Sequence, residues 1–190
     1  MDEEPVVGHV GGINRLCTFM LGHAVSAAGA SQDAWHQTGH SIVAVILAGA
    51  AFEAHLGEFL SAPGFRRMFA TELEDWRDRP PRPHEVLKTI LKRLGVADVS
   101  LLKWYQELRC LFELRNHIAH YYPEPRAVGT FPPKLEANCI QKKIIEPAGD
   151  ASMDWTSRLF IAPVATQAAG IALSAIREFD LIVDAYLSAA

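Results

Sequence analysis

Residues 42 to 52 read Ile-Val-Ala-Val-Ile-Leu-Ala-Gly-Ala-Ala-Phe, which is the longest apolar run in the chain. A helix with this sequence is apolar on every face, and in a soluble protein such a helix is buried on all sides. We therefore expect a central helix over about 33–61, capped by Ser31 or Asp33, whose 42–52 stretch is almost fully buried. Its small residues, 48–51, would let neighbouring helices approach closely.

The chain has a helical pattern on both sides of this run, with prolines and glycines marking where helices end. The basic and aromatic segment 65–79 leads to a stiff connector, Pro80–Pro83. The insert 123–154 has no helical period, contains five prolines and has room for a short hairpin over 134–145. The expected fold is therefore an all-α bundle with a proline-rich insert before its last helix. We expect four other helices, over about 12–29, 84–94, 99–120 and from Trp155 or Pro163 to Leu187. Gly95 would stop the second of these helices, and Asp98 or Ser100 would cap the third.

Composition favours a single domain over residues 1–190. Apolar residues make up 49% of the chain and charged residues 21%, so a sizeable core is available and wholesale disorder is not expected. The net charge of −4 lacks the strong basic excess of dedicated duplex-binding proteins. The middle is locally basic, because residues 63–93 hold eight basic side chains against five acidic ones. This pattern fits either a surface that attracts phosphates or an ordinary solvated helix surface.

Several observations favour a cytoplasmic protein with no membrane partner, metal or cofactor. The start of the chain is acidic where a signal peptide would be basic, and the 42–52 run is shorter than the roughly 20 residues that span a bilayer. The chain contains no P-loop and no dinucleotide-binding glycine fingerprint. His117 with His120, and His55 with Glu58, lack further ligands at suitable spacing. The cysteines match no zinc pattern, and Cys110, set among apolar residues, is expected to be buried; they are Cys17, Cys110 and Cys139.

The helix expected over 99–120 carries the most informative pattern. Arg115 falls at the edge of its apolar stripe, about 60° from Phe112 on a helical wheel. Asn116 and His120 flank the other edge at about 40° and 80°, whereas His117 points towards solvent. The stripe itself consists of Leu101, Tyr105, Leu108, Phe112 and Ala119.

A guanidinium on a core-facing stripe needs a partner, because an unpaired buried charge is costly. Two interpretations are open. Arg115 could pair with a buried acid such as Glu53 and only stabilise the bundle. Alternatively, it could face a cleft and bind an anion such as phosphate.

The segment 114–122, Leu-Arg-Asn-His-Ile-Ala-His-Tyr-Tyr, resembles the signature of the HEPN superfamily. Four residues separate Arg115 from His120, a polar residue (Asn116) follows the arginine, and Tyr122 completes the R-x4-H-x-Y form of HEPN toxins. The looser resemblance covers about 38–187, leaving 1–30 as an N-terminal helix. Within it, the segment 50–56 resembles the family's helix of small and apolar residues that carries an acid, here Glu53.

The resemblance implies an all-α bundle that commonly dimerises, with two motif helices lining one cleft. It further implies a metal-independent endoribonuclease of toxin–antitoxin or phage-defence type, with an antitoxin protein as a further partner. In that mechanism His120 acts as general base or acid on the RNA 2′-hydroxyl, and Arg115 neutralises charge on the phosphorane. Asn116 would hold His120 or a phosphate oxygen. Tyr122 is a site of modification or a phosphate contact, as the family form suggests, or else an ordinary aromatic at the helix end.

The alternative from a different class is a catalytically inactive HEPN module that binds nucleotide, RNA or a protein. One geometric argument favours a dimeric site over a monomeric one. Arg115 and His120 diverge by about 140° on the wheel and by about 7.5 Å in rise, so one helix aims both poorly at one phosphate. Two antiparallel copies across a twofold axis would combine them.

Overall fold

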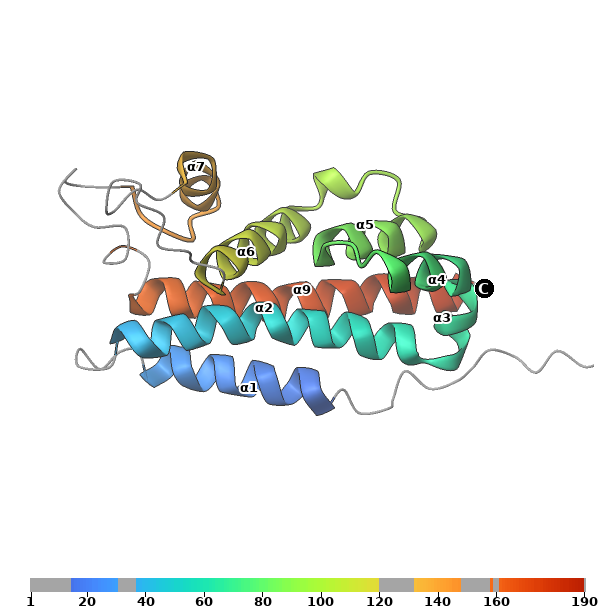
Figure 1. Cartoon of the computed structure of the whole chain (residues 1–190), viewed down its shortest axis with the longest axis horizontal. Helices are drawn as coiled ribbons and strands as arrows, with labels where there is room; N and C mark the ends of the chain where they lie inside the picture. Colours follow the sequence, from blue (N-terminus) through green and yellow to red (C-terminus); the bar gives the residue numbers. More distant parts are fainter. Residues whose placement is uncertain (1–14, 31–36, 120–131, 148–157, 159–160, 190) are drawn as a thin grey trace, which may run out of the picture.

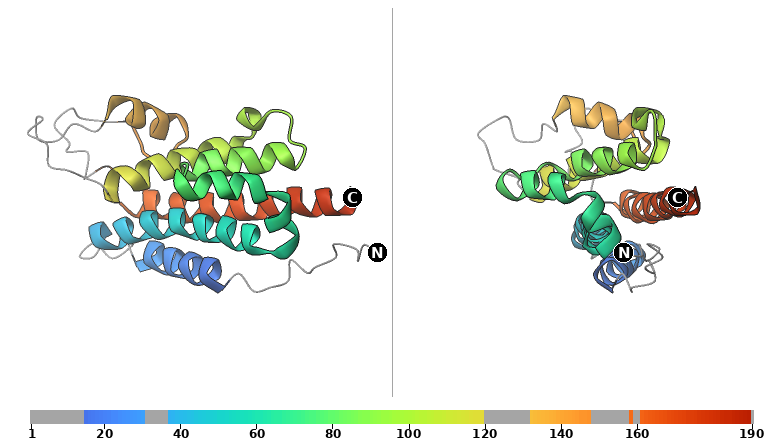
Figure 2. Two further views of the ribbon diagram at one scale, coloured as in Figure 1. Left: turned by 45° about the vertical axis from the view of Figure 1, so that its right-hand side comes forward. Right: turned by 90° about the vertical axis from the view of Figure 1, so that its right-hand side faces the viewer.

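The structure is a computed structural model that describes residues 15–30, 37–119, 132–147, 158 and 161–189. Within these ranges every regular element is a helix, so the expected all-α class is confirmed. Helices α1 (Arg15–Ala30), α2 (Gln37–Ser61) and α9 (Ala162–Ala189) lie lengthwise, and the other helices cover one side of them (Figures 1 and 2). The elements are α1 (Arg15–Ala30), α2 (Gln37–Ser61), α3 (Pro63–Met68), α4 (Ala70–Asp78), α5 (Pro83–Arg93), the 3-10 turn η1 (Val99–Leu101), α6 (Lys103–Ala119), α7 (Pro133–Gln141) and α9 (Ala162–Ala189).

Helix α2 lies at the centre of the arrangement, with α1 on one side, α9 beside it and α6 crossing over both (Figures 1 and 2). The expectation that its 42–52 stretch is almost fully buried was wrong in part. Phe52 is fully buried and Val45 likewise, but Val43 is 43% exposed and Ile46 is only partly covered. The neighbours leave one face of α2 open, and that face carries apolar as well as small residues.

Helix α2 has the length and apolar composition of a membrane-spanning helix, although the 42–52 run alone is shorter than a span. Half of its most apolar window is buried inside the protein. The buried core helix of a soluble protein has the same properties.

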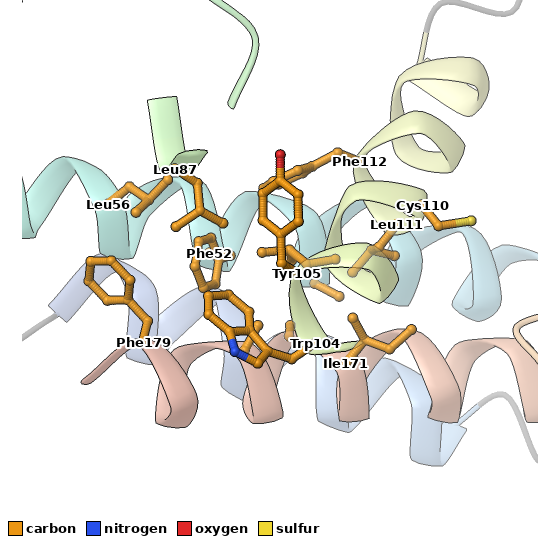
Figure 3. Packing of buried hydrophobic residues seen from close by; sticks show 14 of the residues in the cluster. Phe52, Leu56, Leu87, Trp104, Tyr105, Cys110, Leu111, Phe112, Ile171 and Phe179 are labelled. Carbon is orange, nitrogen blue, oxygen red and sulfur yellow. The ribbon is translucent and has the colours of Figure 1, made fainter. Parts of the chain in front are cut away.

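The core lies where α2, α6 and α9 meet, and aromatic rings join the three helices (Figure 3). The ring of Phe52 lies 6.2 Å from that of Phe112 on α6 and 6.1 Å from that of Phe179 on α9, both edge to face. Such arrangements are favoured by the ring quadrupoles beyond the area they bury. This cluster fixes the position of α6 on α2, and therefore also the place of Arg115 and Asn116, which α6 carries.

Helix α6 begins later than the sequence indicated. Asp98 does act as a cap, as expected, because its side chain accepts a hydrogen bond from the Ser100 backbone N–H at 2.9 Å. It caps the 3-10 turn η1, however, and α6 itself starts at Lys103. Leu101 was assigned to the apolar stripe, but it lies in η1 and is 80% exposed, and Ala119 at the other end is also exposed. The wheel placed Leu101 wrongly because α6 starts only after it, and it placed Ala119 wrongly because the stripe is not covered at the end of the helix.

The hairpin expected over 134–145 is instead helix α7. Pro133 occupies its first turn, where a missing N–H does no harm, and the helix packs Leu135 and Cys139 inwards. The chain leaves α7 through Lys143, which has a positive φ of 57°. Cys139 and Cys110, distant in sequence, lie with their sulfur atoms 3.4 Å apart.

The remaining boundaries agree with expectation to within a few residues. Gly95 has a φ of +91° directly after α5, which is why a glycine stops this helix. The segment 65–79 forms two short helices, and Pro63 begins the first of them rather than only ending α2. The proposed caps Ser31 and Asp33, and half of the insert 123–154 (residues 123–131 and 148–154), lie outside the described residues.

Candidate functional site

Arg115 projects from the last turns of α6 onto α2, at the point where α2 carries Gly49. A Cβ atom placed on Gly49 would lie 3.3 Å from the Arg115 Cγ. The absence of a side chain at this position therefore lets the aliphatic part of Arg115 lie directly on the α2 backbone. The small residues of α2 were expected to permit close approach, and this contact is one instance of it.

The guanidinium of Arg115 is held from two sides. Its Nη2 donates to Glu53 Oε2 at 2.7 Å, and its Nη1 donates to Asn116 Oδ1 at 2.9 Å. Glu53 lies one helical turn after Gly49, so both contacts come from the same face of α2. The sequence-based pairing of Glu53 with Arg115 is thus confirmed, and Asn116 is part of the same group.

This trio (Arg115, Glu53 and Asn116) is partly open to solvent. The Arg115 side chain is 23% exposed and that of Glu53 is 27% exposed. A guanidinium has five N–H donors, and these two hydrogen bonds take one donor each. The trio therefore presents an oriented cation at the surface, whose charge is balanced in part by Glu53.

Burial dominates the electrostatics of Glu53. It raises the pKa of the Glu53 carboxyl above its ordinary value of 4.5, and the charge and hydrogen bond of Arg115 oppose this only in part. The other carboxylate oxygen, Oε1, is buried and has no hydrogen-bond partner within the described part of the chain. Glu53 therefore holds Arg115 while itself bearing a desolvation cost.

Two of the five candidate residues, His120 and Tyr122, lie outside the described residues. The neighbouring His117 was expected to point towards solvent, but it is half-buried, and burial lowers the pKa of its imidazole. A helical wheel gives only the direction of a side chain from the axis of its own helix, so it cannot predict the burial of His117 in the folded chain.

The pairing of His55 was also missed from the sequence. Its Nε2 lies 2.8 Å from Asp180 Oδ1 on α9, while Glu58 Oε1 accepts hydrogen bonds from the backbone N–H groups of Leu16 and Cys17. These side chains tie α2 to α9 and to α1, and no pattern in the sequence marks Asp180 as the partner. Among the residues that the structure describes, no group of three or more His, Cys, Asp or Glu side chains is placed to hold a metal ion.

Comparison of the chain with protein-family models, with curated proteins and with solved structures gives no match.

Proposed function

We propose that this chain is a HEPN-type, metal-independent endoribonuclease acting in toxin–antitoxin or phage defence. One observation supports the proposal: Glu53 and Asn116 hold Arg115 at a place that is partly exposed to solvent. A positioned cation that needs no reorganisation is what a developing phosphorane charge requires. The resemblance of segment 114–122 to the HEPN signature supplies the reaction class.

In the proposed reaction the RNA 2′-hydroxyl attacks the adjacent phosphorus atom. His120 removes the hydroxyl proton or protonates the departing 5′-oxygen, because an imidazole can act as a base or as an acid. Arg115 neutralises the phosphorane, and Asn116, whose Oδ1 is turned to Arg115, offers its amide N–H groups to the substrate or to His120. The products are a 2′,3′-cyclic phosphate and a 5′-hydroxyl, and DNA is not cut because it lacks the nucleophile.

A specific observation favours a second candidate, the catalytically inactive HEPN module that binds nucleotide, RNA or a protein. Glu53 already accepts from Arg115 at 2.7 Å, so a phosphate must compete with an internal counter-ion. In this alternative the pair mainly stabilises the contact of α6 with α2.

The test is incubation of mixed cellular RNA with the whole chain and with single variants, in buffer containing EDTA. Removing a general acid–base group costs about 10²–10⁴ in rate, and removing a stabilising donor about 10²–10³. We expect losses of this size for His120→Ala and Arg115→Ala, and near wild-type cleavage for the control His117→Gln. The new ends should be cyclic phosphates. A folded wild type that leaves every RNA intact would favour the inactive module instead.

A further inference from the structure

Three arginines gather around an open hollow at the C-terminal end of α2. The hollow has a volume of about 820 Å³, and residues of α3 and α4 form most of its lining. These two helices follow directly from α2 (Figure 1). Arg66, Arg67 and Arg77 line it together with Glu74, so the lining carries an excess of positive charge. A concave surface with one sign of charge concentrates ligands of the opposite sign.

These arginines differ from most others in the described structure in lacking a close counter-ion. Arg66 and Arg67 form no ion pair or hydrogen bond with any described side chain, and Arg77 lies 4.0 Å from Asp78 with both side chains largely exposed. By contrast, Arg93 forms an ion pair with Glu72 of α4, with 3.1 Å between Nε and Oε1, and neither residue lines the hollow. The guanidinium groups at the hollow are therefore available to an anion from outside.

The short helices that carry the arginines are anchored to the core. Phe65 and Phe69 are buried, and the Phe65 ring lies 4.0 Å from that of Phe59 on α2. Arg66 and Arg67 are thereby held on the outer face of α3. The lining also includes the apolar residues Pro63, Ala70 and Leu73. Guanidinium groups beside apolar side chains suit a ligand that joins phosphates to flat rings, as a nucleic acid strand does.

One open face of α2 connects the hollow to the Arg115 trio. Glu53, Gly57 and Ser61 are spaced four residues apart, so they lie along the same side of the helix. Gly57 and Ser61 are exposed, and a side chain built on Gly57 would meet no atom within 4 Å. The rise from Glu53 to Ser61 is about 12 Å, a span that a few nucleotides of single strand cover.

We propose that the arginine hollow (Arg66, Arg67 and Arg77) is a second RNA-binding subsite, which holds the phosphates of a single strand that passes over Gly57 to Arg115. The continuation of the strand to Arg115 rests on the proposed nuclease function. The hollow increases the affinity for the RNA strand and positions it along α2, whereas the Arg115 trio takes part in cleavage. Binding and cleavage are therefore separable.

The first experiment measures binding of a short, fully 2′-O-methylated RNA, which lacks the nucleophile and cannot be cut. In a plot of the logarithm of the binding constant against the logarithm of the salt concentration, each phosphate contact with a single strand contributes about 0.7 to the downward slope. The triple variant Arg66→Ala/Arg67→Ala/Arg77→Ala should bind at least about tenfold more weakly, with a salt slope smaller by about 2. The matched control Lys88→Ala/Lys103→Ala/Arg177→Ala removes three charges elsewhere and should keep the wild-type slope. Equal losses in both triple variants, or no RNA binding by the wild type, would overturn the subsite.

The second experiment tests the path over α2 with two substitutions of nearly equal shape. Gly57→Glu places a carboxylate on the open face and should weaken RNA binding several-fold, whereas Gly57→Gln should not. Circular dichroism melts check that each variant folds. Identical binding by the two would contradict the path.

Cleavage assays separate this proposal from the nuclease itself. His120→Ala should leave binding of the methylated RNA unchanged, and the triple variant should raise KM for RNA with little change in kcat. If the wild type binds RNA through the hollow and cuts none, the nuclease fails and the subsite stands. If the triple variant instead loses only binding to anionic lipid vesicles, with RNA affinity intact, the RNA assignment is overturned.

Discussion

The contact of Arg115 with Glu53 combines two opposing effects in one pair of residues. Arg115 draws the carboxylate into its charged form, while the protein around Glu53 disfavours that charge. A pair with about a quarter of each side chain exposed lies between the surface pairs that contribute almost nothing and the buried pairs that cost several kcal/mol to break. Its strength decides whether Arg115 can also serve a phosphate.

A double-mutant cycle measures that strength. We expect a coupling free energy of about 1–2 kcal/mol for Glu53→Gln with Arg115→Met, from urea unfolding at pH 7. The exposed pair Arg109–Glu113, at 3.1 Å and four residues apart on α6, is the internal comparison and should give about 0.3–0.5 kcal/mol. Equal couplings would mean that the Glu53 site is effectively solvated.

The pH dependence of stability tests which effect dominates at Glu53. Because the folded pKa is raised above 4.5, folding favours the protonated carboxyl. Its contribution to stability is fully present below the unfolded pKa and is lost as pH rises through the folded pKa. The stability of the wild type minus that of Glu53→Gln should therefore be larger at pH 4 than at pH 7. The midpoints of urea unfolding of both proteins at the two pH values measure this difference. A wild-type advantage that grows towards pH 7 would show that the Arg115 attraction prevails.

At the scale of helices, the approach of α6 to α2 depends on the missing side chain at Gly49. Gly49→Leu would place a branched side chain against the Arg115 methylenes, because a Cβ atom at position 49 already lies 3.3 Å from the Arg115 Cγ. We expect it to destabilise the fold by about 1–3 kcal/mol, as overpacked sites do. Gly57→Leu, on the same helix with open space around it, should be neutral or slightly stabilising, because leucine is a better helix former than glycine. Thermal unfolding of the two variants provides the comparison.

Helix α1 depends on a side chain from α2 for its N-terminal cap. Glu58 accepts from the backbone N–H groups of Leu16 and Cys17, and burial, together with the charges of Glu58 and Asp180, raises the pKa of the Cys17 thiol to about 11. At pH 8 this thiol is protonated and covered, so we expect it to label very slowly with iodoacetamide.

Glu58→Gln keeps the shape of the cap but loses its charge, which costs about 1 kcal/mol and lets α1 detach more often. Labelling of Cys17 should then accelerate. Cys110 and Cys139 are buried away from α1 and should keep their wild-type rates, as peptide mass mapping would show. Acceleration at all three cysteines would indicate global unfolding, not loss of the cap.

The sequence predicted those features that depend on local rules. Gly95 and Pro163 marked helix boundaries, and the partner of Arg115 followed from the rule that a charge on an apolar face needs an opposite charge. The hairpin that became α7 was wrong because a proline-rich segment can also start a helix, and the choice depends on packing of Leu135 and Cys139 against α6. The exposure of Val43 and the pairing of Asp180 with His55 depend on how the helices pack, which no local pattern specifies.

At the scale of the whole molecule, the candidate site is incomplete in one chain if both motif residues act on one phosphate. Arg115 points onto α2, towards Glu53. The helical wheel drawn from the sequence separates Arg115 from His120 by about 140°. A twofold pair of subunits, the commonest symmetry of oligomers, would place Arg115 of one beside His120 of the other. We therefore predict a homodimer that buries at least about 1,000 Å² in total, detectable by sedimentation at micromolar concentration.

Subunit mixing tests this arrangement directly. Arg115→Ala and His120→Ala homodimers should each be inactive, since every site lacks one partner. In a heterodimer of the two variants, one site combines both substitutions and the other combines intact Arg115 with intact His120. Because half of randomly mixed dimers are heterodimers, cleavage should recover to about a quarter of the wild-type rate per site. Mixing either variant with a Arg115→Ala/His120→Ala double variant should restore nothing, because no such dimer holds a complete site. If mass spectrometry shows that subunits exchange but the mixture of Arg115→Ala and His120→Ala recovers no cleavage, then Arg115 and His120 of the same chain form one site.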